Sequence, residues 1–265
     1  MSEQKSVMDK MKGLLGQKGE STPPTPIPHT EPVPEIKQVH LIVNPAAGQD
    51  VPILKTLNAA FNKMGIEWEM LLTKQAGDAE RLARQAVETG VDVVAVYGGD
   101  GTVLEVARGL HGSRVPMAIL PGGTANVLSV ELGIPRDLSE ALALLSGESS
   151  SVRAIDMGEV GGNLFFHLGI GIEGQITKSA DRAAKDRSGL LAYIFAALKE
   201  LRNPPNARFS MLLDGEHVEV EGVDCMITTF GSIGIAGLSL SHAIDISDGL
   251  LDVLVIRDID LRSVL

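Results

Sequence analysis

Cysteine is almost absent from this chain, which has 265 residues and Cys225 as its single thiol. One cysteine cannot form a disulfide bond within the chain, and this fits a reducing compartment, so we expect a cytoplasmic protein. Cys225 lies in the apolar run DCMITTF, and we interpret it as a buried packing residue rather than a nucleophile.

Long apolar runs and an excess of basic residues are also lacking. No stretch of 18 apolar residues is present, which predicts that no helix spans a membrane. The N-terminus has no apolar core of the kind that signal peptides need. The formal net charge is −11, so most of the surface should repel nucleic acid. Anionic membranes are disfavoured for the same reason, unless a local basic patch provides the contact.

The first residues have the composition of a tail. A short amphipathic pattern over residues 7–15 indicates either a weak interfacial helix or a frayed end. Residues 21–34 are rich in proline and cannot form a helix. We therefore predict a disordered tail and linker over residues 1–35, which the folded part does not need for its stability.

Residues 36–150 alternate between strand and helix patterns. The predicted strands cover 38–43, 66–73, 91–97 and 115–120, and the predicted helices cover 52–64, 78–89, 102–111, 124–132 and 137–146. The run VDVVAVY is apolar almost throughout, as in a parallel strand that is buried on both faces. This order predicts a doubly wound α/β domain.

Residues 151–265 have a different pattern, which predicts a mainly β domain with one long helix. The helix is expected over 189–202, where apolar residues occur nearly all round. The predicted strands lie within 152–172 and over 207–213, 217–220, 223–230 and 251–256, with Asp-Gly turns at 214–215 and 248–249.

Polar or glycine-rich segments follow each predicted strand of the first domain. They are NPAAG at 44–48, Thr73, GGDGT at 98–102 and PGGTAN at 121–126. The carboxyl ends of parallel strands meet at one edge of the sheet, which is where ligands bind in such domains. We therefore expect these segments to form one site.

The GGDGT segment has the features of a phosphate-binding loop. Its glycines let the backbone approach phosphate oxygens, and a helix that begins at Thr102 would attract anions. Asp100 is the one charged group in the loop, and beside phosphates it would hold Mg²⁺ or a proton. The alternative is a tight strand–helix turn with Asp100 as its N-cap. Neither a Walker sequence nor a dinucleotide fingerprint is present.

The same segments resemble the diacylglycerol kinase catalytic domain. GGDGTVLEVARGL (98–110) is similar to that family's GGDGT–E–NGL signature, and LPGGTANVLSVELGIP (120–135) to its LPLGTxNDxAR-x-LGIP stretch. NPAAG matches its NPxxG. Four further segments extend the resemblance over residues 38–265: RAIDMGEV, FFHLGIGIEGQI, SGLLAYIFAALKEL and DGLLDVLVI.

The resemblance implies an ATP-dependent lipid kinase of phospholipid metabolism, with an α/β nucleotide-binding domain and a β-sandwich-like domain. ATP and Mg²⁺ are the implied cofactors, and the implied substrate is a diacylglycerol-like lipid. The resemblance also implies that the protein attaches peripherally to a membrane surface, where it would bind this lipid. Asp100 is the implied catalytic residue. The implied nucleotide contacts are Asn44, Thr73, Gly98, Gly99, Asp100, Gly101, Thr102, Val103, Leu104, Gly123 and Thr124.

A structural Mg²⁺ is implied at the segment DISDGLLDV, through Asp245, Asp248 and the carbonyl oxygen of Leu250. Oxygen ligands at this spacing suit a hard cation. The alternative is an ordinary Asp-Gly turn.

Two departures from the family pattern leave other functions open. Val127 and Val130 replace the acidic and basic residues of NDxAR, and Leu265 ends the chain before a match to the late DGE segment, whose glutamate is thought to be the family's base. We therefore expect the second domain to be incomplete and phosphate transfer to be weak. The alternatives are an NAD kinase-like enzyme, which also uses GGDGT, and an inactive nucleotide-binding module. The acceptor lipid and the oligomeric state, a homo-oligomer included, are not determined by the sequence.

Overall fold

A computed structural model describes residues 30–47, 52–148, 150–171, 206–232, 239–241 and 243–257. The chain divides into two compact units. The α/β unit comprises the described residues within 30–166 and 230–249, and the β unit comprises those within 167–229 and 250–257. Each unit is considered by itself.

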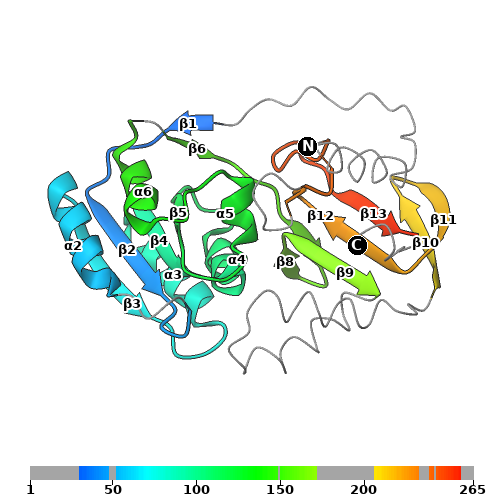
Figure 1. The fold of residues 1–265 in the computed structure, drawn as a ribbon, viewed down its shortest axis with the longest axis horizontal. Coiled ribbons are helices and arrows are strands. Elements are labelled where there is room, and N and C mark those ends of the chain that lie inside the picture. The colour runs from blue at the N-terminus through cyan, green and yellow to red at the C-terminus, as the bar shows by residue number, and fades with distance from the viewer. Residues whose placement is uncertain are drawn as a thin grey trace, which may run out of the picture. The chain divides into compact units, whose positions relative to one another are not determined.

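A parallel sheet of four strands forms the centre of the α/β unit (Figure 1). The strands are β2 (Gln38–Val43), β3 (Glu67–Leu72), β4 (Val93–Gly98) and β5 (Met117–Pro121), in the order β3-β2-β4-β5. All six residues of β4 are buried, as the apolar run in the sequence predicted. The predicted α/β fold class is confirmed.

Helices cover both faces of this sheet, so alternate residues of β4 belong to two cores. Helices α3 (Asp78–Thr89) and α4 (Asp100–Leu110) pack with Val94 and Val96 on one face. Helices α2 (Ile53–Met64) and α6 (Leu138–Ala143), with the 3-10 turn η1 (Leu144–Ser146), pack with Val93 and Ala95 on the other. This two-sided burial holds the carboxyl ends of the strands in fixed positions.

Two helix starts differ from the sequence prediction. Helix α4 begins at Asp100 rather than Thr102, because Gly99 is extended and the chain turns into the helix directly after it. Helix α5 is only Val127–Glu131, because Asn126 has a left-handed backbone with φ of 51° and this ends the loop before the helix. Asparagine is one of the few residues that adopt this conformation readily.

The predicted linker contains a short strand at its end. Strand β1 (Thr30–Pro32) pairs antiparallel with β6 (Ser151–Arg153). Proline is tolerated there because β1 and β6 form a two-stranded sheet whose outer edges require no further donor. Residues 30–32 thus form a strand although they lie before the boundary predicted at residue 35. The rest of the predicted tail, residues 1–29, lies outside the described residues.

The α/β unit also extends beyond the predicted boundary at residue 150. It includes the hairpin of β7 (Gly158–Val160) and β8 (Asn163–Phe165), and it regains residues 230–249 later in the chain. The rings of Phe166 and Phe230 pack against each other at a tilt of 47° with centroids 6.2 Å apart, and Ile246 is 1% exposed in the same core. We call residues 230–249 the return segment.

The β unit contains a three-stranded antiparallel sheet and a two-stranded ribbon. The sheet has the order β13-β12-β9, from Asp252–Ile256, Asp224–Thr228 and His167–Gly171. The ribbon joins β10 (Ala207–Leu213) to β11 (Glu216–Gly222). Asp214 and Gly215 both have positive φ in the turn between them, as the Asp-Gly pair predicts.

Two further sequence predictions concern helices. The long helix expected over 189–202 lies outside the described residues. In the described part of the chain, no helix combines the length and apolar character that crossing a membrane would require.

Two carboxylates that accept backbone hydrogen bonds should make the fold sensitive to acid. Hydrogen bonds from the backbone N–H groups of Lys37 and Gln38 lower the pKa of Asp92. The backbone N–H of Lys74, and then the guanidinium of Arg81, lower the pKa of Asp78. A lowered folded-state pKa stabilises the fold above the unfolded value of about 4, and this contribution is lost as the pH falls through the folded values.

We therefore expect the free energy of unfolding to decrease below a pH of about 4, and less steeply in Asp92→Asn than in the wild type. Urea unfolding at a series of pH values measures both slopes. Glu88→Gln, on the exposed face of α3, serves as the control. Parallel curves for all three proteins would contradict the assignment.

Candidate nucleotide-binding edge

The segments singled out in the sequence lie at the carboxyl edge of the parallel sheet. Residues 44–47 follow β2, and residues 73–78 join β3 to the start of α3. Residues 98–102 run from the end of β4 into the first turn of α4, and residues 121–126 run from the end of β5 to the start of α5. We call these the four edge loops. The chain runs from β2 outward to β3 and then to β4 on the other side of β2. The loops after β2 and β4 therefore flank the switch point, where ligands bind in doubly wound sheets.

Asn44 joins the two loops at the switch point. Its backbone N–H donates to the carbonyl oxygen of Tyr97 at 3.0 Å. Its side-chain Nδ2 donates to Oγ1 of Thr102 at 3.1 Å, and its Oδ1 accepts from the N–H of Ala46 at 3.0 Å. The amide therefore fixes its own loop to the first turn of α4.

The loops after β4 and β5 approach each other so closely that only glycine fits between them. A Cβ atom at Gly123 would lie 2.5 Å from Cα of Gly99. The N–H of Gly122 donates to the carbonyl oxygen of Gly98 at 3.0 Å. A Cβ atom at Gly98 would lie 2.7 Å from Cβ of Thr102. Several glycines of the GGDGT and PGGTAN segments thus have a packing reason that needs no ligand.

Asp100 links the same two loops through its carboxylate. Oδ1 accepts a hydrogen bond from the N–H of Val127 at 2.6 Å, and Oδ2 accepts one from the N–H of Asn126 at 3.1 Å. Asp100 is not the N-cap of its own helix, whose N-cap is Gly99. It caps the neighbouring helix α5 instead, which sequence reasoning could not have found because the partners are 26 and 27 residues away.

Asn126 completes this connection and was not among the predicted site residues. Its Oδ1 accepts from the N–H of Gly123 and its Nδ2 donates to the carbonyl oxygen of Gly123, both at 2.8 Å. The side chain thus closes the PGGTAN loop on itself, and Asn126 is 6% exposed. Its position at the end of a glycine-rich loop was a visible signal, because asparagine tolerates positive φ.

Among the described residues, the start of α4 has open space beside Gly101 and first-turn N–H groups that have no acceptor within the helix. The first-turn N–H groups of a helix have no intrahelical acceptor, and here the first bond of this kind runs from Val103 to the carbonyl of Gly99. A Cβ atom at Gly101 would meet no heavy atom within 4 Å, and Thr124 is exposed. Val103 and Leu104 instead pack in or against the core, so we expect them to support the site without polar contact.

The loop after β3 is held by two carboxylates. The N–H of Thr73 donates to the carbonyl oxygen of Val43 at 3.0 Å. Asp78 Oδ2 accepts from the N–H groups of Lys74 and Gln75 at 2.9 and 3.1 Å. Glu105 in α4 accepts from the N–H of Ala79 at 3.1 Å.

Gly109, one turn of α4 further along, lets α3 and α4 pack closely, because a Cβ atom there would lie 2.5 Å from the carbonyl oxygen of Glu80. Glu105 and Gly109, which match the later part of the GGDGT–E–NGL signature, therefore hold α3 against α4 and so help to position the loop after β3.

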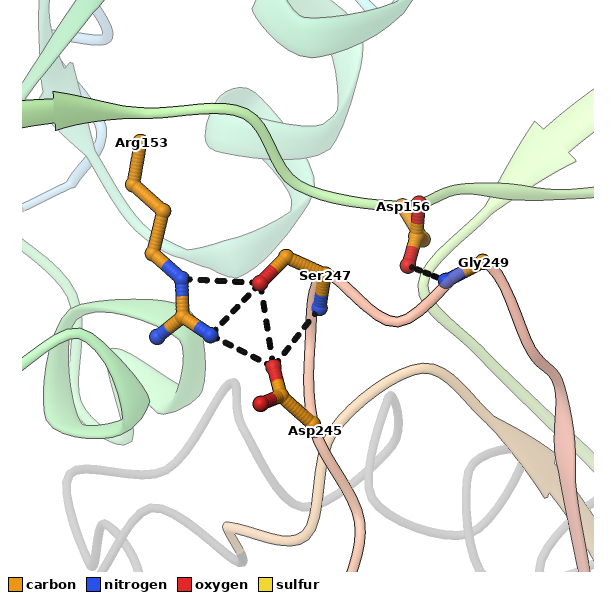
Figure 2. Close-up of polar contacts among 5 residues, drawn as sticks. All are labelled: Arg153, Asp156, Asp245, Ser247 and Gly249. Carbon is orange, nitrogen blue, oxygen red and sulfur yellow. Dashed lines mark hydrogen bonds and ion pairs between the residues drawn. The ribbon is translucent and has the colours of Figure 1, made fainter. Parts of the chain in front are cut away.

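The predicted metal residues lie in the return segment and just after it (Figure 2). Oδ1 of Asp245 accepts hydrogen bonds from Nη2 of Arg153 and from both N–H and Oγ of Ser247. Asp156 accepts from the N–H of Gly249 at 2.7 Å and donates its own N–H to the carbonyl oxygen of Ile246. The turn is therefore docked on residues 153–156 by protein contacts.

The donor chemistry at this turn suits Mg²⁺ only in part. Asp245, Asp248 and the Leu250 carbonyl would supply the hard oxygen ligands that Mg²⁺ prefers. Arg153 already forms an ion pair with Asp245, so a cation would have to share this carboxylate or displace the guanidinium. Among the described residues, no cluster of three or more Asp, Glu, His or Cys side chains is placed to hold a metal ion.

The structural Mg²⁺ thus remains a prediction, and thermal unfolding across a Mg²⁺ titration tests it. Asp248→Ala should lower the melting temperature relative to wild type by more when Mg²⁺ is present than when it is absent. Asp156→Ala, which removes the acceptor of the Gly249 N–H, should lower it with and without Mg²⁺. If the difference in melting temperature between Asp248→Ala and wild type does not change with Mg²⁺, the turn binds no Mg²⁺ and is held by protein contacts alone.

Comparison with known proteins is consistent over both units. The family model described as the diacylglycerol kinase catalytic domain matches residues 38–160. A second model, described as the YegS C-terminal NAD kinase beta sandwich-like domain, matches residues 167–265. A solved structure of a diacylglycerol kinase from Bacillus anthracis superposes with a TM-score of 0.66 and 32% identity, covering 84% of this chain and 74% of that one.

Curated relatives carry similar names. "Diacylglycerol kinase" of Bacillus subtilis is 28% identical over 235 residues, which are 86% of this chain and 76% of that protein. "Probable lipid kinase YegS-like" of Pseudomonas syringae is 38% identical over 165 residues, 61% of this chain. The match covers 50% of the Pseudomonas protein, so the chain spans about half the length of that relative and of its close homologues.

Proposed function

We propose a lipid kinase function for this chain, which belongs to the diacylglycerol kinase catalytic-domain family. In this proposal the four edge loops bind ATP, and the γ-phosphate is transferred to the hydroxyl group of a lipid. A diacylglycerol-like lipid is the first acceptor to test, because both Bacillus relatives are named for it. The membrane surface would be the place where acceptor and enzyme meet.

One observation carries the nucleotide part of the proposal. The loops after β2, β4 and β5 are joined to one another by Asn44, Asp100 and close glycine contacts, yet the first turn of α4 keeps free space at Gly101. A helix N-terminus attracts phosphate through its unpaired N–H groups and its dipole. Loops fixed in this way around free space at a helix N-terminus support the proposal of a preorganised phosphate site, and preorganisation supplies much of the rate in phosphoryl transfer.

The chain's own residues then have distinct roles in the proposal. The N–H groups at the start of α4 hold the phosphates, with Thr73 and Thr124 beside them. Asp100 and Asn126 hold the loops after β4 and β5 in register. Mg²⁺, when bound with ATP, supplies neutralisation of the charge that develops on the phosphate oxygens. Because both oxygens of Asp100 already accept backbone hydrogen bonds, we propose positioning as its main contribution.

A panel of acceptors with labelled ATP tests this proposal against its alternatives. Diacylglycerol, a sphingoid base, a polyprenol and NAD are offered separately, and the binding of ATP is measured by calorimetry on the same preparation. NAD enters the panel because the second family model is described by its likeness to an NAD kinase domain.

The possible outcomes separate the candidates. Transfer to a lipid and not to NAD supports the lipid kinase. Transfer to NAD alone would replace it by the NAD kinase-like alternative, and ATP binding without any transfer would support a nucleotide-binding module. Failure to bind ATP would overturn the assignment of the four edge loops themselves.

A further inference from the structure

The four edge loops contain few charged groups, and among the described residues the carboxylates have protein partners whereas the ammonium group has no ion-pair partner. Three charged residues are present in these loops: Lys74, Asp78 and Asp100. Both carboxylates are used by the protein, since Asp78 accepts two backbone N–H groups and pairs with Arg81, and Asp100 accepts two backbone N–H groups from the loop after β5. Lys74 is exposed, and within the described residues its ammonium group forms no ion pair.

The backbone of Lys74 is fixed although its ammonium group is not. Its N–H donates to Oδ2 of Asp78 at 2.9 Å, and the preceding N–H of Thr73 donates to the last residue of β2, Val43. The base of the side chain is therefore held at the carboxyl edge. Lysine carries its compact charge on a flexible four-carbon stem, so the ammonium group can move to a ligand without any change in the loop.

The order of the sheet places this cation near the start of α4. Strand β3 neighbours β2, which neighbours β4, and adjacent strands lie about 4.8 Å apart. The ends of β3 and β4 are therefore separated by about 10 Å, the spacing of two strands. A phosphate chain that begins at the first turn of α4 and extends toward β3 would bring a later phosphate toward Lys74.

We infer that Lys74 binds one of the outer phosphates of the nucleotide and makes this site prefer triphosphates to diphosphates and monophosphates. The inference rests on the proposed ATP site and adds to it the residue that distinguishes the length of the phosphate chain. A local cation matters here because the chain carries a formal net charge of −11, which opposes the approach of a polyanion.

Calorimetric titration with ATP, ADP and AMP, in the absence of Mg²⁺, tests the inference without any need for phosphate transfer. Lys74→Met should weaken ATP binding about tenfold, as expected for loss of one charged hydrogen bond. It should weaken ADP binding less and leave AMP binding unchanged. Added salt should weaken ATP binding to the wild type more than to the variant. Lys74→Arg should retain most of the preference.

Lys63→Met is the matched control, because it removes the same charge from an exposed position in the last turn of α2. That helix ends where the chain enters β3, which is the opposite edge of the sheet. Melting temperatures of both variants should equal that of the wild type.

Equal losses for ATP, ADP and AMP in Lys74→Met, or a loss no larger than in Lys63→Met, would overturn the inference while leaving the ATP site in place. A wild-type protein that binds none of the three nucleotides would instead overturn the proposed function.

Discussion

Asp100→Asn should reduce phosphate transfer by about 10²-fold or more, and it should also weaken ATP binding when Mg²⁺ is absent. The carboxylate accepts one backbone N–H on each oxygen. An asparagine in its place keeps one acceptor and turns an NH₂ group toward the other N–H, so one link between the loops after β4 and β5 becomes repulsive. Turnover with the best acceptor of the panel, calorimetry and thermal unfolding together measure the effect.

ATP binding in the absence of Mg²⁺, together with the melting temperature, distinguishes the two roles that Asp100 could have. If it organises the metal or the proton, turnover falls while metal-free ATP binding and melting temperature stay at wild-type values. If it positions the loops, all three fall together. Asp137→Asn is the control for the loss of a capping charge alone, because Oδ1 of Asp137 accepts the N–H groups of both Ser139 and Glu140 at the start of α6 and an asparagine oxygen keeps both bonds. Wild-type turnover in Asp100→Asn would exclude both roles.

Gly123→Ala and Gly101→Ala should have opposite effects on folding and similar effects on ATP. At Gly123 the new Cβ would lie 2.5 Å from Cα of Gly99, so backbone must move and the protein should lose about 1–3 kcal/mol of stability. At Gly101 the new Cβ meets no protein atom within 4 Å. Alanine also suits a helix better than glycine, by about 0.5–1 kcal/mol, so that variant should be as stable as the wild type or more so.

Measurements of ATP binding to the two glycine variants test whether phosphate lies beside Gly101. Gly101→Ala should weaken ATP binding by at least tenfold if phosphate occupies the space beside Gly101, because a Cβ atom there would then collide with the phosphate although it meets no atom of the described residues. Gly123→Ala should weaken it as well, through displacement of the loop. Urea unfolding and calorimetry on the same samples measure both properties. A stable Gly101→Ala protein with normal ATP affinity would show that the phosphate lies elsewhere.

In the α/β unit, local sequence patterns predicted most helices and strands but not all of their boundaries. The apolar run of β4 and the helical spacing of α2 and α3 predicted these elements correctly. Burial of one face of a helix, or of both faces of a strand, sets the spacing of apolar residues, and this spacing can be recognised in the sequence alone. The misplaced boundaries are those that depend on single residues. Gly99 and Asn126 decide where α4 and α5 begin, and β1 exists because β6 is available as its partner.

The sequence by itself determined the fold class, the family and the four edge loops, because each is written in contiguous residues: strand periods, turn residues and short glycine-rich motifs. Only the tertiary structure decided what the members of the motifs do. Asp100 caps α5, Glu105 holds α3, and Arg153 holds Asp245. These partners are 26 to 92 residues apart in the chain, and side chains meet across such distances only where the packing of the sheet and its helices brings them together.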